Sequence, residues 1–131
     1  MILDTSAVVA VIRGEQGEAR LVEAIEGAAT VGIGTPTLAE ASIVLVRRMG
    51  VVGRLALARF LQERDIVTIP FDEEHFKVAA EADIRYGKGR HAAALNYGDC
   101  LTYATARIAD LPLLFTGNDF AQTDIPSALS S

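Results

Sequence analysis

Apolar residues occur along the chain as short runs, separated by longer segments in which they recur every three or four positions. Short runs rich in β-branched residues indicate buried strands, whereas the longer spacing is typical of amphipathic helices. Strands are therefore expected at residues 2–3, 31–33, 66–69 and 113–115, with an edge strand at 123–125. Because strands and helical segments alternate, the pattern predicts an α/β fold with a central, mostly parallel sheet of four to five short strands covered by helices on both faces.

Turn and capping residues set the expected bounds of the helices. Helical segments are predicted at residues 7–13, 15–25, 35–49 and 51–64. One more follows Asp72, a candidate cap, and another begins near Asp99. The helix after Asp72 carries the apolar residues Phe76, Ala79, Ala80 and Ile84, and the helix near Asp99 is expected to bury Leu101, Ala104, Thr105 and Ile108.

The composition predicts one globular domain over residues 1–131, since half of the 131 residues are hydrophobic and 22% are charged. No apolar run approaches the ~18–20 residues of a membrane span. The first residues carry no basic segment of a secretory signal, so a cytoplasmic protein is expected. A lone cysteine, Cys100, with only His75 and His91, excludes a disulfide framework and a Cys/His zinc site.

The net charge of −5 argues against an obvious nucleic-acid binder, but basic residues gather in two stretches. Residues 47–64 hold five arginines and one acid, and residues 85–91 hold no acid. These stretches are either solvated helix faces and a flexible loop, or a path for a nucleic-acid backbone. The residues considered for RNA binding are Arg47, Arg48, Arg54, Arg59, Lys88 and Arg90.

Acidic residues from distant parts of the chain follow the predicted strands. Asp4 ends the first strand, Glu40 lies about one turn into the helix after the second, Asp99 opens the helix before the fourth, and Asp119 follows the fourth. In parallel sheets the functional site lies at this edge. Each acid also has a structural interpretation: Asp4 and Asp99 as helix caps, Asp119 as a turn residue, and Glu40 as an exposed or ion-paired helix position.

Carboxylates gathered at one edge repel each other, and a hard divalent cation removes that repulsion. Mg²⁺ prefers oxygen ligands and needs only one or two direct carboxylates, and two such ions suit phosphoryl chemistry. We expect Asp4 and Asp99 to bind metal directly, and Glu40 and Asp119 to hold metal-bound waters or a second ion. The surrounding hydrogen-bonding groups are expected to be Thr5, Ser6, Thr116 and Asn118.

Four segments together resemble a PIN-domain ribonuclease, and more narrowly the VapC toxins of bacterial type II toxin–antitoxin systems. They are residues 2–7 (Ile-Leu-Asp-Thr-Ser-Ala), 36–40 (Pro-Thr-Leu-Ala-Glu), 95–104 (Leu-Asn-Tyr-Gly-Asp-Cys-Leu-Thr-Tyr-Ala) and 116–120 (Thr-Gly-Asn-Asp-Phe). The resemblance runs from residue 2 to about 126. It implies a PIN-like three-layer α/β/α domain and a Mg²⁺- or Mn²⁺-dependent endoribonuclease acting on tRNA or rRNA. It also implies the catalytic acids Asp4, Glu40, Asp99 and Asp119, a VapB-type antitoxin as partner, and a homodimer.

The chain departs from the family pattern at the fourth acid. Many PIN domains place it two residues after the threonine, where this chain has Asn118, with Asp119 as its neighbour. A phosphotransfer protein fits less well, since a haloacid-dehalogenase-type phosphatase needs a second aspartate at position 6, where Ser6 stands. A receiver domain needs a phosphorylatable aspartate after a middle strand, and the third strand ends at Ile69-Pro70-Phe71. A catalytically silent PIN-like module that binds RNA or serves as a scaffold is the remaining alternative.

Overall fold

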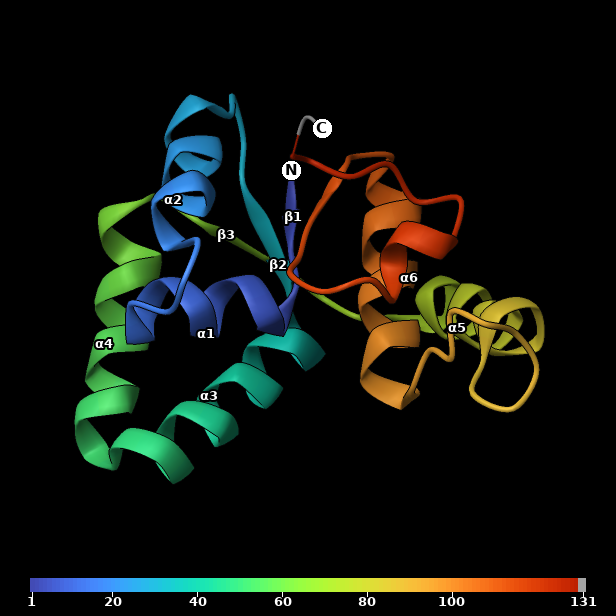
Figure 1. The fold of residues 1–131 in the computed structure, drawn as a ribbon, viewed down its shortest axis with the longest axis horizontal. Helices are drawn as coiled ribbons and strands as arrows, with labels where there is room; N and C mark the ends of the chain where they lie inside the picture. Colours follow the sequence, from blue (N-terminus) through green and yellow to red (C-terminus); the bar gives the residue numbers. More distant parts are fainter. Residues whose placement is uncertain (130–131) are drawn as a thin grey trace.

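The computed structural model describes residues 1–129, which form a four-stranded sheet between two layers of helices (Figure 1). The strands are β1 (Ile2–Leu3), β2 (Gly32–Gly34), β3 (Val67–Ile69) and β4 (Leu113–Leu114). They lie in the order β3-β2-β1-β4, and each neighbouring pair is parallel. The predicted three-layer α/β fold is confirmed. The predicted single domain runs to residue 131, so its last two residues lie outside the described part.

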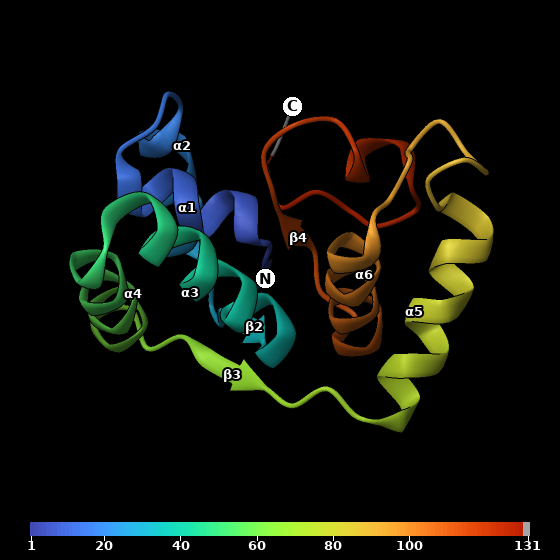
Figure 2. The same ribbon diagram turned by 90° about the horizontal axis from the view of Figure 1, so that it is seen from below.

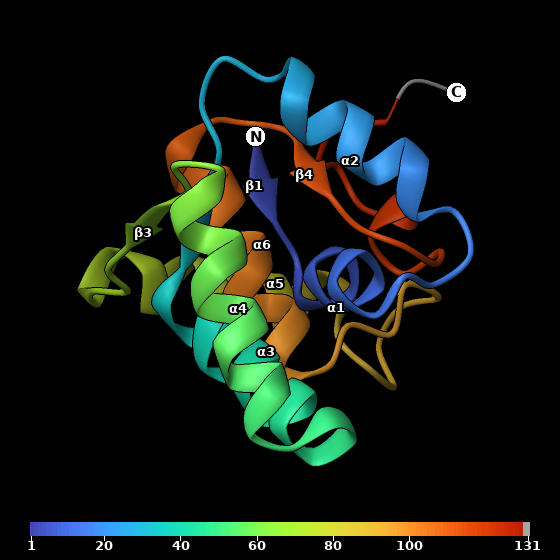
Figure 3. The ribbon, with the colours of Figure 1, turned by 90° about the vertical axis from the view of Figure 1, so that its left-hand side faces the viewer.

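The helices divide between the two faces of the sheet as the order of the strands requires (Figure 2). One face carries α1 (Thr5–Arg13), α2 (Glu18–Gly27), α3 (Thr35–Met49) and α4 (Val51–Glu63), and the other carries α5 (Glu73–Tyr86) and α6 (Tyr97–Ala109). Figure 3 shows α3 and α4 packed side by side as a helical hairpin. Strand order reverses at β1, so the carboxyl ends of β1 and β4 form the switch point at which parallel sheets bind ligands.

Side chains on the two central strands alternate between two separate cores. Leu3 and Leu114 pack with α1–α4, whereas Ile2 and Leu113 pack with α5 and α6, and all four are buried. This alternation is the two-residue period of a strand. Both faces of β1 and β4 are therefore covered, which explains why these strands are uniformly apolar in sequence.

The glycines of β2 let α6 and the side chain of Ile69 on β3 approach this strand closely. A Cβ atom at Gly34 would lie 2.7 Å from the hydroxyl oxygen of Thr105 on α6. A Cβ atom at Gly32 would lie 2.8 Å from the side chain of Ile69. Because α6 carries Asp99 at its start, this close packing fixes the distance between Asp99 and the end of the sheet.

The buried face of α5 differs by about one position from the apolar residues noted in the sequence of this helix. The structure buries His75, Ala79, Ala82 and Tyr86, whereas Phe76, Ala80 and Ile84 are exposed. Both sets recur at a helical spacing, so periodicity alone did not separate them. His75 can face inward because its ring and backbone take part in a capping box with Asp72. On α6, Leu101 and Ile108 are only half-buried, and Thr102 and Tyr103 take the interior positions instead.

The predicted edge strand at residues 123–125 is absent from the described chain. A short 3₁₀ helix, η1 (Phe120–Gln122), precedes this segment, and Asp124 accepts hydrogen bonds from the Tyr103 hydroxyl (2.6 Å) and from Arg107 (2.7 Å). These bonds hold the segment against α6. A single bridge between Leu113 and Ser127 forms in place of the strand.

None of the helices within residues 1–129 combines the length and the apolar character required to cross a bilayer.

Candidate active site

Asp4 occupies the carboxyl end of β1, and only 6% of the residue is exposed. Its Oδ2 accepts hydrogen bonds from the backbone N–H of Ser6 (3.1 Å) and from the Ser6 hydroxyl (2.6 Å), so that Asp4 caps α1. Burial raises the pKa of Asp4, and the hydrogen bonds from Ser6 partly oppose that shift. Capping does not exclude a chemical role, since the same carboxylate also lines the cleft described below.

Glu40 lies on α3, opposite Asp4, and is exposed. The hydroxyl of Thr5 donates a hydrogen bond to its Oε1 at 2.6 Å. Gly98, in the first turn of α6, packs against the same carboxylate, because a Cβ atom there would lie 2.9 Å from Oε2. A glycine at position 98 thus allows α6 to start beside Glu40.

Asp99 is the third residue of α6 rather than its cap. The cap is Asn96, whose Oδ1 accepts the backbone N–H of Asp99 (2.8 Å), while Asp99 Oδ2 accepts the backbone N–H of Asn96 (3.1 Å). Burial, together with the negative charges of Asp4, Asp119 and Glu40, raises the pKa of Asp99 to about 6, and the hydrogen bond from the Asn96 backbone partly opposes that shift. The four predicted acids therefore act on one another electrostatically.

The turn after β4, which holds Thr116, Asn118 and Asp119, lies next to the carboxyl end of β1. The backbone N–H of Thr116 donates to the Ser6 hydroxyl at 3.0 Å, which links β4 to the start of α1. Asn118 and Asp119 are both exposed in this turn, and Asp119 is the residue whose charge acts on Asp99. Asp119 lies one residue after the position at which the family pattern has its fourth acid.

A cleft of about 300 Å³ connects these segments, and it contains an unpredicted pairing of charges. Its wall includes Asp4, Glu40 and Asp99, together with Glu15 and Arg48. Arg48 lies 3.7 Å from Glu15, which Arg13 contacts at 2.7 Å. Of the six residues considered for RNA binding, Arg48 is the one that lines this cleft; Arg59 pairs with Glu63 on α4, and Arg90 with Asp83 on α5.

The side chains of the cleft suit a hard cation in chemistry and leave room for its waters. Every ionisable candidate ligand in the wall is a carboxylate, the donor that Mg²⁺ and Mn²⁺ prefer. No three acidic, histidine or cysteine side chains within residues 1–129 are grouped closely enough to enclose an ion by themselves. Mg²⁺ keeps several waters and takes one or two carboxylates, so the pair Asp4 and Asp99 is a sufficient protein contribution.

A buried pair of hydroxyls supports the acids and was missed by sequence reasoning. Thr37 on α3 and Thr102 on α6 lie 2.8 Å apart through their Oγ1 atoms, and Thr102 also hydrogen-bonds Asp4. Threonines on amphipathic helices carry no distinctive signal. The available clue was position, since Thr37 lies three residues before Glu40 and Thr102 lies three after Asp99, so each shares a helix face with an acid.

Cys100 is buried, next to Asp99 in the first turn of α6. Burial raises the pKa of its thiol to about 11, and the charges of Asp83 and Asp99 contribute. A thiolate nucleophile is disfavoured at neutral pH, because the thiol stays protonated.

The PIN domain family model matches residues 1–126 of the chain. Ribonuclease VapC36 of Mycobacterium tuberculosis is 50% identical over 126 residues, which cover 95% of this chain and 91% of that protein. The residues that the family model matches include all four segments that carry the predicted acids.

Solved structures share the fold at lower sequence identity. The sarcin–ricin loop cleaving toxin VapC20 of M. tuberculosis superposes with a TM-score of 0.81 at 17% identity, covering 98% of each chain. The structure of VapBC2 from Rickettsia felis, bound to a DNA fragment from its promoter, superposes with a TM-score of 0.76 at 16% identity. The match covers 96% of this chain and 94% of that one. At these identities the likeness concerns the arrangement of helices and strands.

The raised pKa of Asp99 predicts how stability depends on pH. A carboxyl group whose pKa is about 6 in the fold and near 3.8 when unfolded binds more protons in the fold, so its ionisation lowers stability as pH rises from about 4 to about 6. In a chelating buffer at pH 7.5, the free energy of unfolding of Asp99→Asn should exceed that of wild type by about 1 kcal/mol, after allowance for solvent screening. Urea unfolding of both proteins at pH 4 and at pH 7.5 measures this difference.

The control is Glu23→Gln on the exposed side of α2. It should not change the pH dependence. An advantage of Asp99→Asn that is equally large at pH 4 and pH 7.5 would contradict the assigned cause.

Proposed function

The chain belongs to the PIN-domain family and is a ribonuclease of the VapC type, and we propose that it cleaves RNA internally with Mg²⁺ or Mn²⁺ held by Asp4 and Asp99. The observation that supports this assignment is that Asp4, Glu40 and Asp99 line one cleft at the switch point of the sheet, while the charge of Asp119 acts on Asp99. Burial and then the negative charges of the other three acids raise the pKa of Asp99, and an ion of opposite charge relieves the repulsion among them. The enzyme is the toxin of a toxin–antitoxin system.

A divalent cation in such a site polarises the phosphate and acidifies a bound water. The protein residues divide the remaining work. Asp4 is held by Ser6 and Thr102, which fix its orientation. Thr5 occupies Oε1 of Glu40, so that Oε2 is left to accept a hydrogen bond or a proton from a water in the cleft. We assign Asp119 as the fourth acid, since its charge acts on Asp99.

Arg48 is the best candidate among the predicted RNA-binding residues to contact substrate. Its guanidinium lines the same cleft as Asp4 and Asp99, and its pairing with Glu15 is loose, at 3.7 Å. Glu15 already has a close partner in Arg13 at 2.7 Å, so Arg48 can turn to a phosphate without leaving Glu15 unpaired. The guanidinium also matches phosphate oxygens in geometry. We propose that tRNA or rRNA enters along this side, where Arg47 adds to the positive charge.

A VapB-type antitoxin is the proposed protein partner. The Rickettsia felis structure that shares this fold is a VapBC complex, and a similar chain from Klebsiella pneumoniae comes from a toxin–antitoxin complex. We propose that the antitoxin places an arginine or lysine beside the acids, because a cation there competes with metal. Exposed apolar residues on the α3–α4 hairpin, including Ile43, Val51 and Leu55, offer anchors for the same segment. A homodimer stays a prediction.

Removing one metal-binding carboxylate should abolish cleavage. We expect Asp4→Asn and Asp99→Asn to reduce the cleavage rate about a thousandfold or more, because a metal ion contributes several kcal/mol and each 1.36 kcal/mol is a factor of ten. Cleavage of total RNA with added Mg²⁺ or Mn²⁺ measures the effect. Circular dichroism should show an intact fold. Wild-type rates in either variant would refute the site, and cleavage by none of the proteins would favour the catalytically silent module.

Arg48 and its neighbour Arg47 provide a matched test of the RNA path. If Arg48 contacts one phosphate, Arg48→Ala should reduce the slope of log affinity against log salt by about 0.7 for single-stranded RNA. Arg47→Ala on the same helix should change the slope less, and Arg59→Ala should leave it unaltered. Fluorescence titrations in a chelating buffer provide the slopes. Equal effects of all three substitutions would show diffuse attraction instead of a contact.

Expression alone should arrest growth, and co-expression of the cognate antitoxin should restore it. The proposed cation of the antitoxin acts on Asp4 and Asp99, so replacing that arginine or lysine by alanine should restore toxicity while the complex still assembles through the hairpin. Growth curves together with co-purification separate the two effects. Protection that survives loss of every basic residue in the inserted segment would exclude this mode of silencing.

A further inference from the structure

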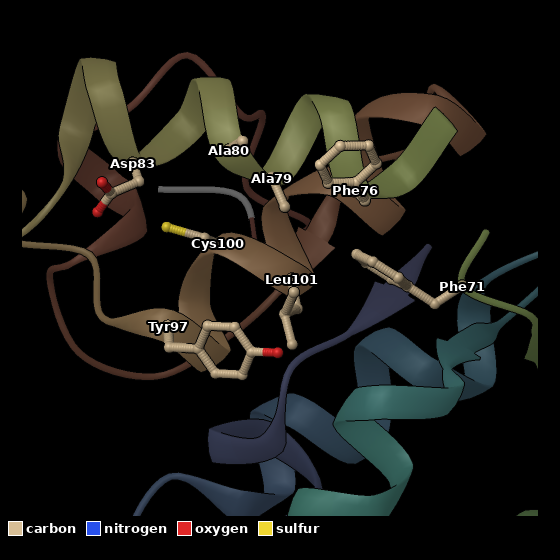
Figure 4. Close-up of a pocket in the computed structure, with 8 residues that line it drawn as sticks. All are labelled: Phe71, Phe76, Ala79, Ala80, Asp83, Tyr97, Cys100 and Leu101. Atoms are coloured by element: carbon tan, nitrogen blue, oxygen red, sulfur yellow. The ribbon is translucent and has the colours of Figure 1, made fainter. Parts of the chain in front are cut away.

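A second hollow lies beside the carboxylate cleft, between α5 and α6. Its volume is about 340 Å³, within the ~300–1,000 Å³ typical of ligand pockets. Figure 4 shows Tyr97 and Leu101 of α6 facing Phe76 and Asp83 of α5, with Phe71 at one end. We call this hollow the α5–α6 groove. The ribonuclease chemistry described above does not use it.

The walls of the α5–α6 groove hold both exposed aromatic side chains of residues 1–129. Tyr97 is 81% exposed and Phe76 is 56% exposed, whereas the other aromatic residues are buried or half-buried. An exposed ring costs hydration free energy that a folded chain normally avoids. Two such rings on adjoining helices, facing one hollow, indicate a surface that a flat apolar group covers.

The α5–α6 groove is continuous with the site of cleavage. Tyr97 and Leu101 line both the groove and a smaller pocket of about 120 Å³ that also contains Glu40 and Gly98. Glu40 in turn lines the carboxylate cleft. On the interior side, the thiol of Cys100 is affected by the charges of both Asp83 and Asp99. A strand of RNA whose phosphate lies at Asp4 and Asp99 therefore has the groove beside it.

The polar groups at the rim favour a nucleobase over a purely apolar ligand. Asp83 contributes a carboxylate that is half exposed, and Arg90 lies 3.7 Å from it. The carboxylate can accept hydrogen bonds from the exocyclic amino groups of cytosine, adenine or guanine, whereas uracil presents carbonyl oxygens there. Arg90 supplies positive charge for an adjoining phosphate. Aromatic rings combined with nearby basic residues are the usual platform for single-stranded RNA.

We propose that the α5–α6 groove is a nucleobase subsite, in which one base of the RNA substrate stacks on Tyr97 and Phe76 and donates an exocyclic amino hydrogen to Asp83. The inference rests on the proposed ribonuclease function and adds that the groove recognises the identity of one base in the RNA substrate. Bases with an amino group are accepted at this position, and uracil is disfavoured because its carbonyl faces the carboxylate.

Binding of the single-stranded hexamers C6, A6 and U6 to the full chain tests the subsite. A chelating buffer prevents cleavage, and fluorescence anisotropy reports affinity. Wild type should bind C6 and A6 more tightly than U6. Tyr97→Ala and Phe76→Ala should each weaken C6 binding about tenfold, the typical size of a stacking contact. Tyr97→Phe keeps the ring and should restore the affinity lost in Tyr97→Ala. Asp83→Asn can donate as well as accept, so it should remove the discrimination against U6.

The matched control is Ile84→Ala, an exposed apolar residue on α5 that is not part of the groove wall. It should bind all three hexamers as wild type does. Equal binding by Tyr97→Ala and Ile84→Ala, or equal affinity of wild type for C6 and U6, would overturn the subsite. A change from dimer to monomer in Tyr97→Ala during sedimentation, with C6 affinity unaltered, would overturn it by showing a contact between copies.

Cleavage of total RNA by the same preparations distinguishes a failure of the subsite from a failure of the proposed ribonuclease function. If wild type cleaves with added metal and Tyr97→Ala binds normally, the subsite is wrong and the ribonuclease assignment stands. If wild type neither cleaves RNA nor binds any hexamer, the proposed function fails and the subsite fails with it.

Discussion

Asp4 is buried at the carboxyl end of β1, and each of its polar groups is committed to a different part of the fold. Its N–H donates to Leu114 on β4 at 3.0 Å, its C=O accepts from the first turn of α1, and its side chain accepts from Ser6. A buried carboxylate is unfavourable unless such bonds satisfy it. The sheet, the first helix and the acidic cleft therefore meet at one residue, whose backbone joins the sheet to the helix and whose side chain faces the cleft.

The sequence was sufficient to predict the sheet edge at which the acids meet, because strand order and side-chain period follow general rules. Asp4 and Asp119 follow strands, Glu40 and Asp99 lie near the starts of helices, and parallel strands place their carboxyl ends together. The finer features depend on packing between distant segments. Asn96 rather than Asp99 caps α6, and Thr37 and Thr102 meet beneath the cleft, although neither hydroxyl differs in sequence from an ordinary helix residue.

The errors in the expected helix faces have a common physical origin. On α5, Phe76 and Ile84 are large and apolar and yet exposed, whereas the helix turns His75 and Tyr86 inward. Hydrophobicity predicts that a side chain will be removed from water. It does not say whether the rest of the chain or a bound ligand buries it. The segment at 123–125 failed as a strand for a related reason, since Asp124 is bound by Tyr103 and Arg107 on α6.

The order of the strands also sets when the site can exist during synthesis. β1 is made first and β4 almost last, yet the two are neighbours, and Thr116 closes the cleft by bonding to Ser6 across 110 positions of sequence. A ribosome that has completed only β1, β2 and β3 holds a chain without Asp99, Thr116 or Asp119. The cleft can therefore be completed only after β4 and the turn that follows it have been made, although β1, β2 and β3 are synthesised earlier.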